Sequence, residues 1–174
     1  MEIPGLGVVE KDDRFDWYRS KPMPVSVLGT KRCRIVVEGY DEDRKKEEFH
    51  TAIANFLSIT PSVLAEAALY VFQYYGACKE QAGPDDEEFA KIKSAASVFR
   101  HVRLGREPMV TRREYGDKGV YVSLECACDW EQEHGLQIVF KNGLRVNKVG
   151  PYDGHLTNSD AYDSKKLENV IFYW

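Results

Sequence analysis

The sequence has few of the features that mark secreted or membrane-bound chains. Its apolar stretches are shorter than the roughly 18 residues that a membrane span needs. The N-terminus, which begins Met-Glu-Ile-Pro-Gly, shows neither the basic start nor the apolar core of a secretion signal. Only four cysteines occur among 174 residues, too few and too unevenly spaced for a disulfide framework. We therefore expect a cytoplasmic protein with free thiols and no membrane partner.

Basic residues are also fewer than acidic ones. Lys and Arg together number 24 against 28 for Asp and Glu, which gives a formal charge of −4 at pH 7. Nucleic-acid binding depends on a basic face that releases counterions from phosphates, so we expect no nucleic-acid partner. An acidic surface instead favours a basic protein partner, because opposite charges attract the two molecules during encounter.

The common catalytic motifs are missing as well. We find no phosphate-binding glycine loop, no nucleophile elbow and no zinc-protease helix in the sequence. The sequence therefore predicts no catalytic residue and no cofactor. Apolar residues make up 43% of the chain, and a chain of this length can bury about 70% of the surface that its unfolded form exposes. We expect residues 1–174 to form a single domain.

The hydrophobic pattern changes from strands to helices after about residue 43. Before that point, short apolar segments are separated by Asp, Pro, Gly and Thr, which is typical of strands and turns. The next apolar residues recur at helical spacing and predict a first helix: Phe49, Ile53, Phe56 and Leu57. Thr60 as N-cap and Pro61 at the first helical position predict a second helix, which we expect to run to Tyr75 and stop near Gly76.

A third helix is predicted to begin in the acidic stretch Asp-Asp-Glu-Glu at residues 85–88. Asp85 or Asp86 is a suitable N-cap, and the helix is expected to end near Val102. Four apolar residues recur at the spacing of one helix face: Phe89, Ile92, Ala96 and Phe99. The order of strands, helices and strands then predicts an α+β fold, in which an antiparallel sheet from the N- and C-terminal strands packs against two or three central helices.

The strand that begins at Val120 alternates between two kinds of residue. One face carries Val120, Val122, Leu124, Cys126 and Cys128, and the other carries Tyr121, Ser123, Glu125, Ala127 and Asp129. The two cysteines continue the apolar row, so we interpret them as buried thiols. Further along, a bulged hairpin with a Lys141-Asn142-Gly143 loop is predicted, because it pairs Phe140 with Leu144 and Ile138 with Val146.

Candidate binding residues lie in two segments. The first, residues 129–135, has the sequence Asp-Trp-Glu-Gln-Glu-His-Gly between two predicted strands, and we expect a solvated acidic corner with Trp130 folded onto the sheet edge. The second, residues 150–162, is a polar loop rich in turn residues, of the kind that often carries binding residues. The predicted binding residues are Trp130, Glu131, Glu133, His134, Tyr152, Asp153 and His155.

A metal site is the alternative interpretation of the same region. Thiolate and imidazole groups are good zinc ligands, and the candidates are Cys126, Cys128, His134 and His155. These residues lack the paired spacing of the common zinc modules. The sequence alone leaves both interpretations open, a binding surface and a metal-binding module or metal-dependent enzyme.

The segment from Cys126 to Asn158, taken with the Ser-Val-Phe-Arg-His-Val and Tyr-Val-Ser-Leu-Glu-Cys stretches upstream, resembles an uncharacterised bacterial family of small cytoplasmic domains. That family shares a Cys-rich strand, Trp-Glu-x-Glu-His-Gly, an apolar strand, a glycine turn and a closing Asp-Gly. The matching positions are Cys126, Cys128, Trp130, Glu131, Glu133, His134, Gly135, Gly143, Asp153 and Gly154.

Some relatives of this broad kind are similar to immunity proteins that are encoded beside polymorphic toxins. The resemblance implies an α+β domain and assigns no catalytic residue. Together with the acidic charge, it favours a protein that binds another protein, with a basic toxin as the expected kind of partner.

Overall fold

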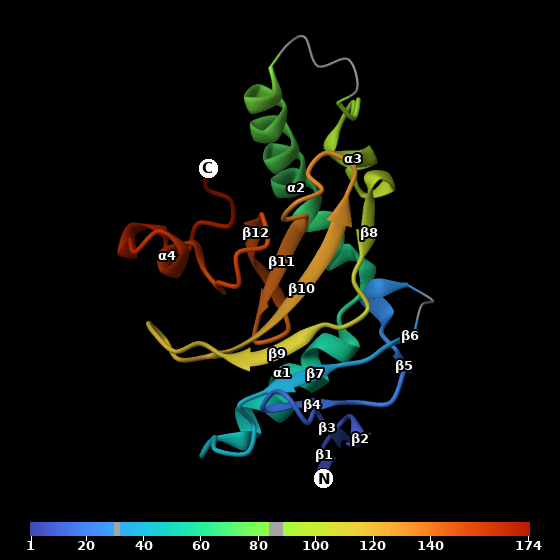
Figure 1. Ribbon diagram of the computed structural model, residues 1–174, viewed down its shortest axis with the longest axis vertical. Coiled ribbons are helices and arrows are strands. Elements are labelled where there is room, and N and C mark those ends of the chain that lie inside the picture. Colours follow the sequence, from blue (N-terminus) through green and yellow to red (C-terminus); the bar gives the residue numbers. More distant parts are fainter. Residues whose placement is uncertain (30–31, 84–88) are drawn as a thin grey trace.

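A strongly twisted sheet forms the centre of the molecule, with α1 and α2 behind it and the C-terminal segment beside β12 (Figure 1). The computed structural model describes residues 1–29, 32–83 and 89–174. The N-terminal strands lie at one end of the molecule, and the turn between β10 and β11 lies at the other, near α3 (Figure 1). The predicted α+β fold is confirmed.

The main sheet has the strand order β12-β11-β10-β9-β7-β4-β3, with β8 added to the end of β10. Nearly all of its pairings are antiparallel, as the sequence predicts, and the exception is the parallel pair β7 and β9. Two further two-stranded sheets pair β1 with β2 and β5 with β6. The strands are β1 (Glu2–Ile3), β2 (Gly7–Val8), β3 (Glu10–Lys11), β4 (Trp17–Arg19), β5 (Met23–Pro24), β6 (Arg32–Cys33), β7 (Val36–Glu38), β8 (Val102–Leu104), β9 (Met109–Arg112), β10 (Val120–Cys128), β11 (Leu136–Lys141) and β12 (Arg145–Gly150).

Two helices supply most of the apolar cover. Helix α1 (Lys46–Ser58) packs against β9 and β10, and helix α2 (Pro61–Ala82) packs against β12. The short helices are α3 (Ala95–Val98) and α4 (Asn158–Ala161). No single helix of the described residues is long and apolar enough to cross a membrane, and only α1 and α2 taken together, bent by 90° at their junction, meet the length and composition criteria.

The second helix does not stop near Gly76, so that prediction is wrong. Helix α2 continues to Ala82 and ends at Gly83, which has a positive φ of 90°. A glycine inside a helix costs only about 1 kcal/mol. Burial of Cys78 beyond Gly76 helps to offset that cost, because its side chain packs into the core only if the helix continues.

The predicted third helix is also largely wrong. Only Ala95–Val98 is α-helical, followed by a short 3-10 turn at Phe99–His101, and the proposed caps at 85 and 86 lie outside the described residues. The reason lies in Tyr75, whose hydroxyl donates to the carbonyl of Ala90 at 2.8 Å and accepts from the backbone N–H of Ile92 at 3.2 Å. The tyrosine hydroxyl thus bonds the carbonyl of Ala90 and the N–H of Ile92, two backbone groups that would otherwise need partners within a helix.

Strands β10 and β11 are buried on both faces. On the helix side Val122 faces Phe140 and Leu124 faces Ile138, and all four have no exposed surface. On the other side Tyr121, Val139 and Leu156 form a second apolar cluster. The central hairpin is therefore the middle layer of the molecule, and the chain after β12 supplies its outer cover.

The hairpin of β11 and β12 has a different register from the predicted one. Phe140 pairs with Val146 and Ile138 with Val149, so the predicted partners were wrong. The three-residue loop is Asn142-Gly143-Leu144, and a bulge after Val139 takes up the extra residue of β12. The apolar pairing on which the prediction depended is kept, because the bulge moves Val146 and Val149 onto the core face.

Gly143 explains where this turn lies. It has a positive φ of 66°, and a Cβ atom at this position would lie 2.1 Å from the carbonyl oxygen of Ala52 in α1. The turn therefore rests directly on the helix backbone, at a distance that only glycine permits. Asn55 adds a hydrogen bond from its side-chain amide to the carbonyl of Asn142, at 2.9 Å.

The outer cover is attached to the sheet by two buried cations. Arg113, directly after β9, is 3% exposed and donates to both carboxylate oxygens of Asp160 and of Glu168, at 2.5–2.9 Å. These hydrogen bonds hold the pKa of Glu168 below its ordinary value. Lys148 in β12 is 1% exposed and donates to the side chain of Gln137, the carbonyl of His155 and the carboxylate of Asp153.

We predict that Gly143→Ala destabilises the fold far more than Gly154→Ala. Gly154 also has a positive φ, of 79°, but has no atom within 4 Å of the added Cβ. Its substitution should cost only the backbone strain, about 1 kcal/mol. Gly143→Ala adds a clash with the backbone of α1 and should cost at least about 3 kcal/mol in denaturant unfolding. Equal losses for the two variants would contradict the close contact between turn and helix.

Candidate functional site

The acidic corner, residues 129–135, turns the chain from β10 into β11. The carboxylate of Glu131 accepts the backbone N–H groups of Glu133, at 3.0 Å, and of His134, at 2.7 Å. Gly135 follows with a positive φ of 67°, where a Cβ would lie 2.5 Å from the carbonyl oxygen of Cys126. The corner is thus a tight turn with a defined shape, built on one carboxylate and one glycine.

Trp130 anchors the corner to α2. Its side chain is 6% exposed, and its ring meets those of Tyr74 and Tyr75 edge to face, at centroid distances of 6.1 and 5.9 Å. The sequence predicts that Trp130 folds onto the sheet edge, and the structure places its ring against the tyrosines of α2. Its indole Nε1 is buried and has no hydrogen-bond acceptor among the residues that the structure describes, an arrangement that is rare because it leaves a polar group desolvated.

The carboxylates of the corner have few partners on their own chain. Asp129 meets His101 Nδ1 at 3.1 Å and the largely exposed Arg103 at 3.8 Å. Glu131 Oε1 lies 3.6 Å from His134 Nδ1. Glu133 is exposed and has no ion pair with a Lys or Arg of the described chain. The corner therefore presents negative charge that the fold itself leaves largely uncompensated.

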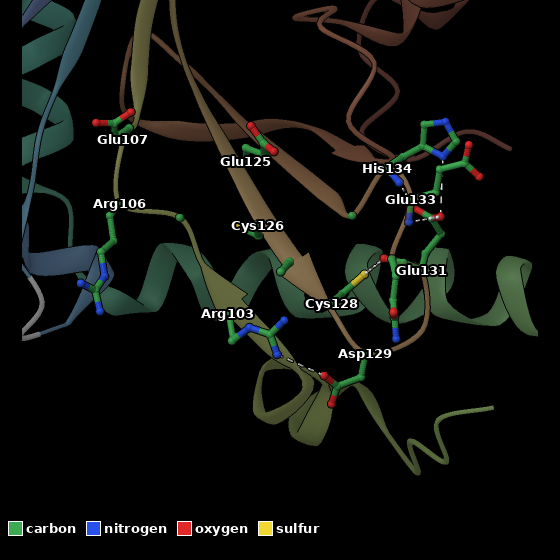
Figure 2. Close-up of a pocket in the computed structure, with 14 residues that line it drawn as sticks. Arg103, Arg106, Glu107, Glu125, Cys126, Cys128, Asp129, Glu131, Glu133 and His134 are labelled. Carbon is green, nitrogen blue, oxygen red and sulfur yellow. Dashed lines mark hydrogen bonds and ion pairs between the residues drawn. The ribbon is translucent and has the colours of Figure 1, made fainter. Parts of the chain in front are cut away.

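A cavity of about 600 Å³ lies on the sheet side of the corner, and we call it the sheet-end cavity. Figure 2 shows Arg103 reaching towards Asp129, while Glu131, Glu133 and His134 lie together at the other side. Its rim carries both signs of charge, because Arg106 and Glu107 also line it. Cations of the chain itself therefore accompany the acidic groups of this cavity.

A second cavity of about 730 Å³ lies on the other side of the corner, and we call it the aromatic cavity. All seven predicted binding residues line it, although they come from two segments of the sequence. The structure adds residues from α2 and from the end of the chain. The lining residues that carry aromatic rings or charge are Tyr74, Phe89, Trp130, Glu131, Glu133, His134, Tyr152, Asp153, His155, Tyr162 and Trp174.

The aromatic cavity is acidic. Of its described lining residues, three are carboxylates and none is Lys or Arg. Asp153 is already matched by the buried ammonium of Lys148, so the carboxylates of Glu131 and Glu133 remain. A cavity of this size is in the range of small-ligand sites, which are mostly apolar with a few polar groups that orient the ligand.

Several residues of this cavity were missed by the sequence reasoning. Tyr74 lies three residues after Val71 and four before Cys78, so helical spacing alone could have placed it on the buried face of α2. Trp174 could not be placed, because the sequence does not show where its C-terminal segment folds back. In the structure its ring lies 5.6 Å from that of Tyr74.

The cysteines occupy the core row, as the alternation predicts. Cys126 and Cys128 are each 3% exposed, and the thiol of Cys128 donates to the carbonyl of Glu131 at 3.2 Å. Burial raises the pKa of Cys126 to about 12 and that of Cys128 to about 11. Both residues are therefore thiols at neutral pH, whereas metal binding uses the thiolate.

The four candidate metal ligands do not form a cluster. No three of Cys126, Cys128, His134 and His155 have donor atoms within 4.8 Å of one another. Among the described residues, the group that meets this distance is Glu131, Glu133 and His134. Only one of its members, His134, belongs to the predicted set, and the carboxylate of Glu131 in that group already accepts two backbone N–H groups.

Comparison with known proteins identifies one family. The model of a family described as a domain of unknown function, DUF6985, matches residues 5–156. No curated protein and no solved structure is significantly similar to the chain. The matched residues include the whole acidic corner, β10, β11 and β12, and they end just before α4.

We predict that the cysteines are inert in the native protein. All four are buried, so at about pH 8, where an exposed thiol is partly ionised, a bulky aromatic disulfide reagent should react only as fast as the chain unfolds. The same reagent should titrate all four thiols at once in guanidinium chloride. Rapid modification of Cys126 and Cys128 without denaturant would show that their side of the strand is open.

Proposed function

This chain belongs to the DUF6985 family, domains of unknown function, and we propose that it is a non-enzymatic domain that binds a basic protein through its acidic corner. The two cavities flank this corner and share Glu131, Glu133 and His134. A partner that covers the corner therefore reaches both cavities at once. We further propose that the protein acts in the cytoplasm of a bacterium.

The observation that carries the proposal is a contrast in how the chain uses its carboxylates. Away from the corner, Asp160, Glu168 and Asp153 are bonded to the buried cations Arg113 and Lys148. These acids stabilise the fold. At the corner, Glu133 has no such partner among the described residues, and Asp129 contacts His101 at 3.1 Å and an exposed arginine at 3.8 Å.

Unpaired surface carboxylates add little to folding stability. They are effective in association, because complementary charge raises the rate of encounter and disfavours partners of the wrong sign. The corner also meets a second requirement of a binding surface, since Trp130 holds it against α2 in one conformation. A surface that is already ordered loses little entropy on binding.

We propose that the partner is a toxin and that this chain neutralises it as an immunity protein does. The support is the resemblance of the Trp130–Gly135 motif to a bacterial family with immunity-like relatives, together with the acidic net charge of −4. Inhibition of a basic enzyme needs only a tight complex that covers its active surface. The absence of a catalytic motif in the sequence is consistent with that role.

The test compares two triple variants of equal charge. Asp129→Asn, Glu131→Gln and Glu133→Gln neutralise the corner, while Asp13→Asn, Glu2→Gln and Glu42→Gln neutralise three exposed acids far from it. A labelled peptide that alternates Arg-Lys with Gly-Ser serves as the basic probe. The corner variant should bind it about tenfold more weakly at low salt, equivalent to about 1.4 kcal/mol, chiefly through a slower association rate.

The control variant should bind the probe as the wild type does, and neither variant should melt more than a few degrees below it. The amide oxygen introduced by Glu131→Gln still accepts one of the two backbone N–H groups. In a bacterial host, expression of the wild-type chain should also relieve the growth arrest caused by a toxin encoded beside its gene, and the corner variant should not. Equal binding by the two triple variants would show that the corner has no special role.

A further inference from the structure

We propose that the aromatic cavity is the anchor pocket for one arginine side chain of the basic partner. This inference rests on the proposed function and names the group that the partner inserts. The cavity offers what a guanidinium ion requires, aromatic faces for stacking and carboxylates for hydrogen bonding. Each requirement is met by residues from a different part of the chain.

The aromatic walls come from three separate segments. Tyr74 of α2 and Trp130 of the corner meet edge to face at 6.1 Å. Trp174 at the C-terminal end lies 5.6 Å from Tyr74. Tyr152 and Tyr162 complete the lining and are 38% and 47% exposed. Exposed aromatic rings gathered around one cavity are unusual for a protein surface that binds nothing, because contiguous apolar patches mark interaction sites.

The charge of the cavity selects a cation. Glu131 and Glu133 line it, and no Lys or Arg does so among the described residues. Lys148, which is bonded to the lining carboxylate of Asp153, is buried beneath it and is also held by Gln137. A cationic ligand therefore meets the exposed carboxylate of Glu133 and the carboxylate of Glu131, which also accepts two backbone N–H groups, and no Lys or Arg of the described lining repels it.

The sheet-end cavity is a poorer site for the same ligand. Arg103 and Arg106 line it, and an incoming cation would have to compete with them for the carboxylates that both cavities share. It is also lined by no Phe, Tyr or Trp among its described residues. The comparison points to the aromatic cavity as the pocket that takes the partner's cation.

Trp130 gives an independent indication that a ligand belongs in this cavity. Its side chain lines the cavity and is 94% buried, and its Nε1–H has no acceptor among the described residues. A buried N–H without a partner costs roughly 1–3 kcal/mol. A carbonyl oxygen of the partner would remove that cost once the side chains that cover Nε1 move aside, because the atom itself has almost no accessible surface.

Arginine fits better than lysine for geometric reasons. A guanidinium is planar, so it can stack on a ring and still donate two N–H bonds to a carboxylate in its own plane. An ammonium is more strongly hydrated and lacks a flat face. The volume of about 730 Å³ leaves space for the residues on either side of the arginine.

The experiment uses the full chain and three short peptides that differ at one position. Gly-Ser-Arg-Ser-Gly carries the guanidinium, the citrulline peptide keeps its shape without the charge, and the lysine peptide keeps the charge without the plane. Calorimetric titration should show the tightest binding for arginine. We expect lysine to bind several-fold more weakly, and citrulline to bind at least about tenfold more weakly.

Two variants locate the site of binding. Trp174→Ala and Tyr152→Ala each remove a partly exposed ring of the cavity. Each should lower the affinity for the arginine peptide at least about fivefold. Tyr115→Ala is the matched control, because Tyr115 is 68% exposed and does not line the cavity. It should leave binding unchanged. Circular dichroism confirms that each variant is folded, which these exposed positions should allow.

The outcomes separate this inference from the proposed function. If the alternating Arg-Lys probe still depends on the corner carboxylates but arginine and citrulline peptides bind equally, the anchor pocket is refuted and the binding role remains. The same conclusion follows if Trp174→Ala and Tyr115→Ala have equal effects. If the alternating probe does not bind the wild-type chain, both proposals fail.

Discussion

The guanidinium of Arg113 is the group on which the candidate site most depends. It is buried, and it binds two carboxylates, of Asp160 and Glu168, that belong to the C-terminal segment. That segment carries Tyr162 and Trp174, two walls of the aromatic cavity. Loss of one partner of a buried ion pair costs about 3–5 kcal/mol, because the other charge remains desolvated. Arg113 therefore stabilises the position of these two walls, together with the contacts that Lys148 makes to the same segment.

The same chain uses carboxylates in two opposite ways. Around Arg113 and Lys148 they compensate buried positive charge, and every such acid is fixed in position by several hydrogen bonds. At the acidic corner Asp129 and Glu133 are exposed, while Glu131 is half-buried and its backbone bonds shape the turn. Folding accounts for the first group and does not require the charge of the second. This difference is the physical basis for assigning recognition to the corner.

The sequence predicts local structure well and long-range contacts poorly. Alternation along β10 placed both cysteines in the core, and helical spacing located α1. The stop at Gly76 and the third helix failed because burial around Tyr75 and its hydroxyl bonds to the backbone outweigh local signals. For the site, residue types suggest seven binding candidates that line one cavity, but no pattern reveals that distant rings such as Tyr74 and Trp174 meet across the fold.

The central claim is that the aromatic cavity receives a guanidinium, and the indole N–H resonances of the protein test it most directly. The chain has three tryptophans. Trp130 and Trp174 line the cavity, whereas Trp17 lies in β4 at the opposite end of the molecule with its Nε1–H bonded to Glu38 (Figure 1). On titration with the arginine peptide, the account predicts saturable shifts of the Trp130 and Trp174 signals and none for Trp17. Shifts of all three alike, or of none, would contradict it.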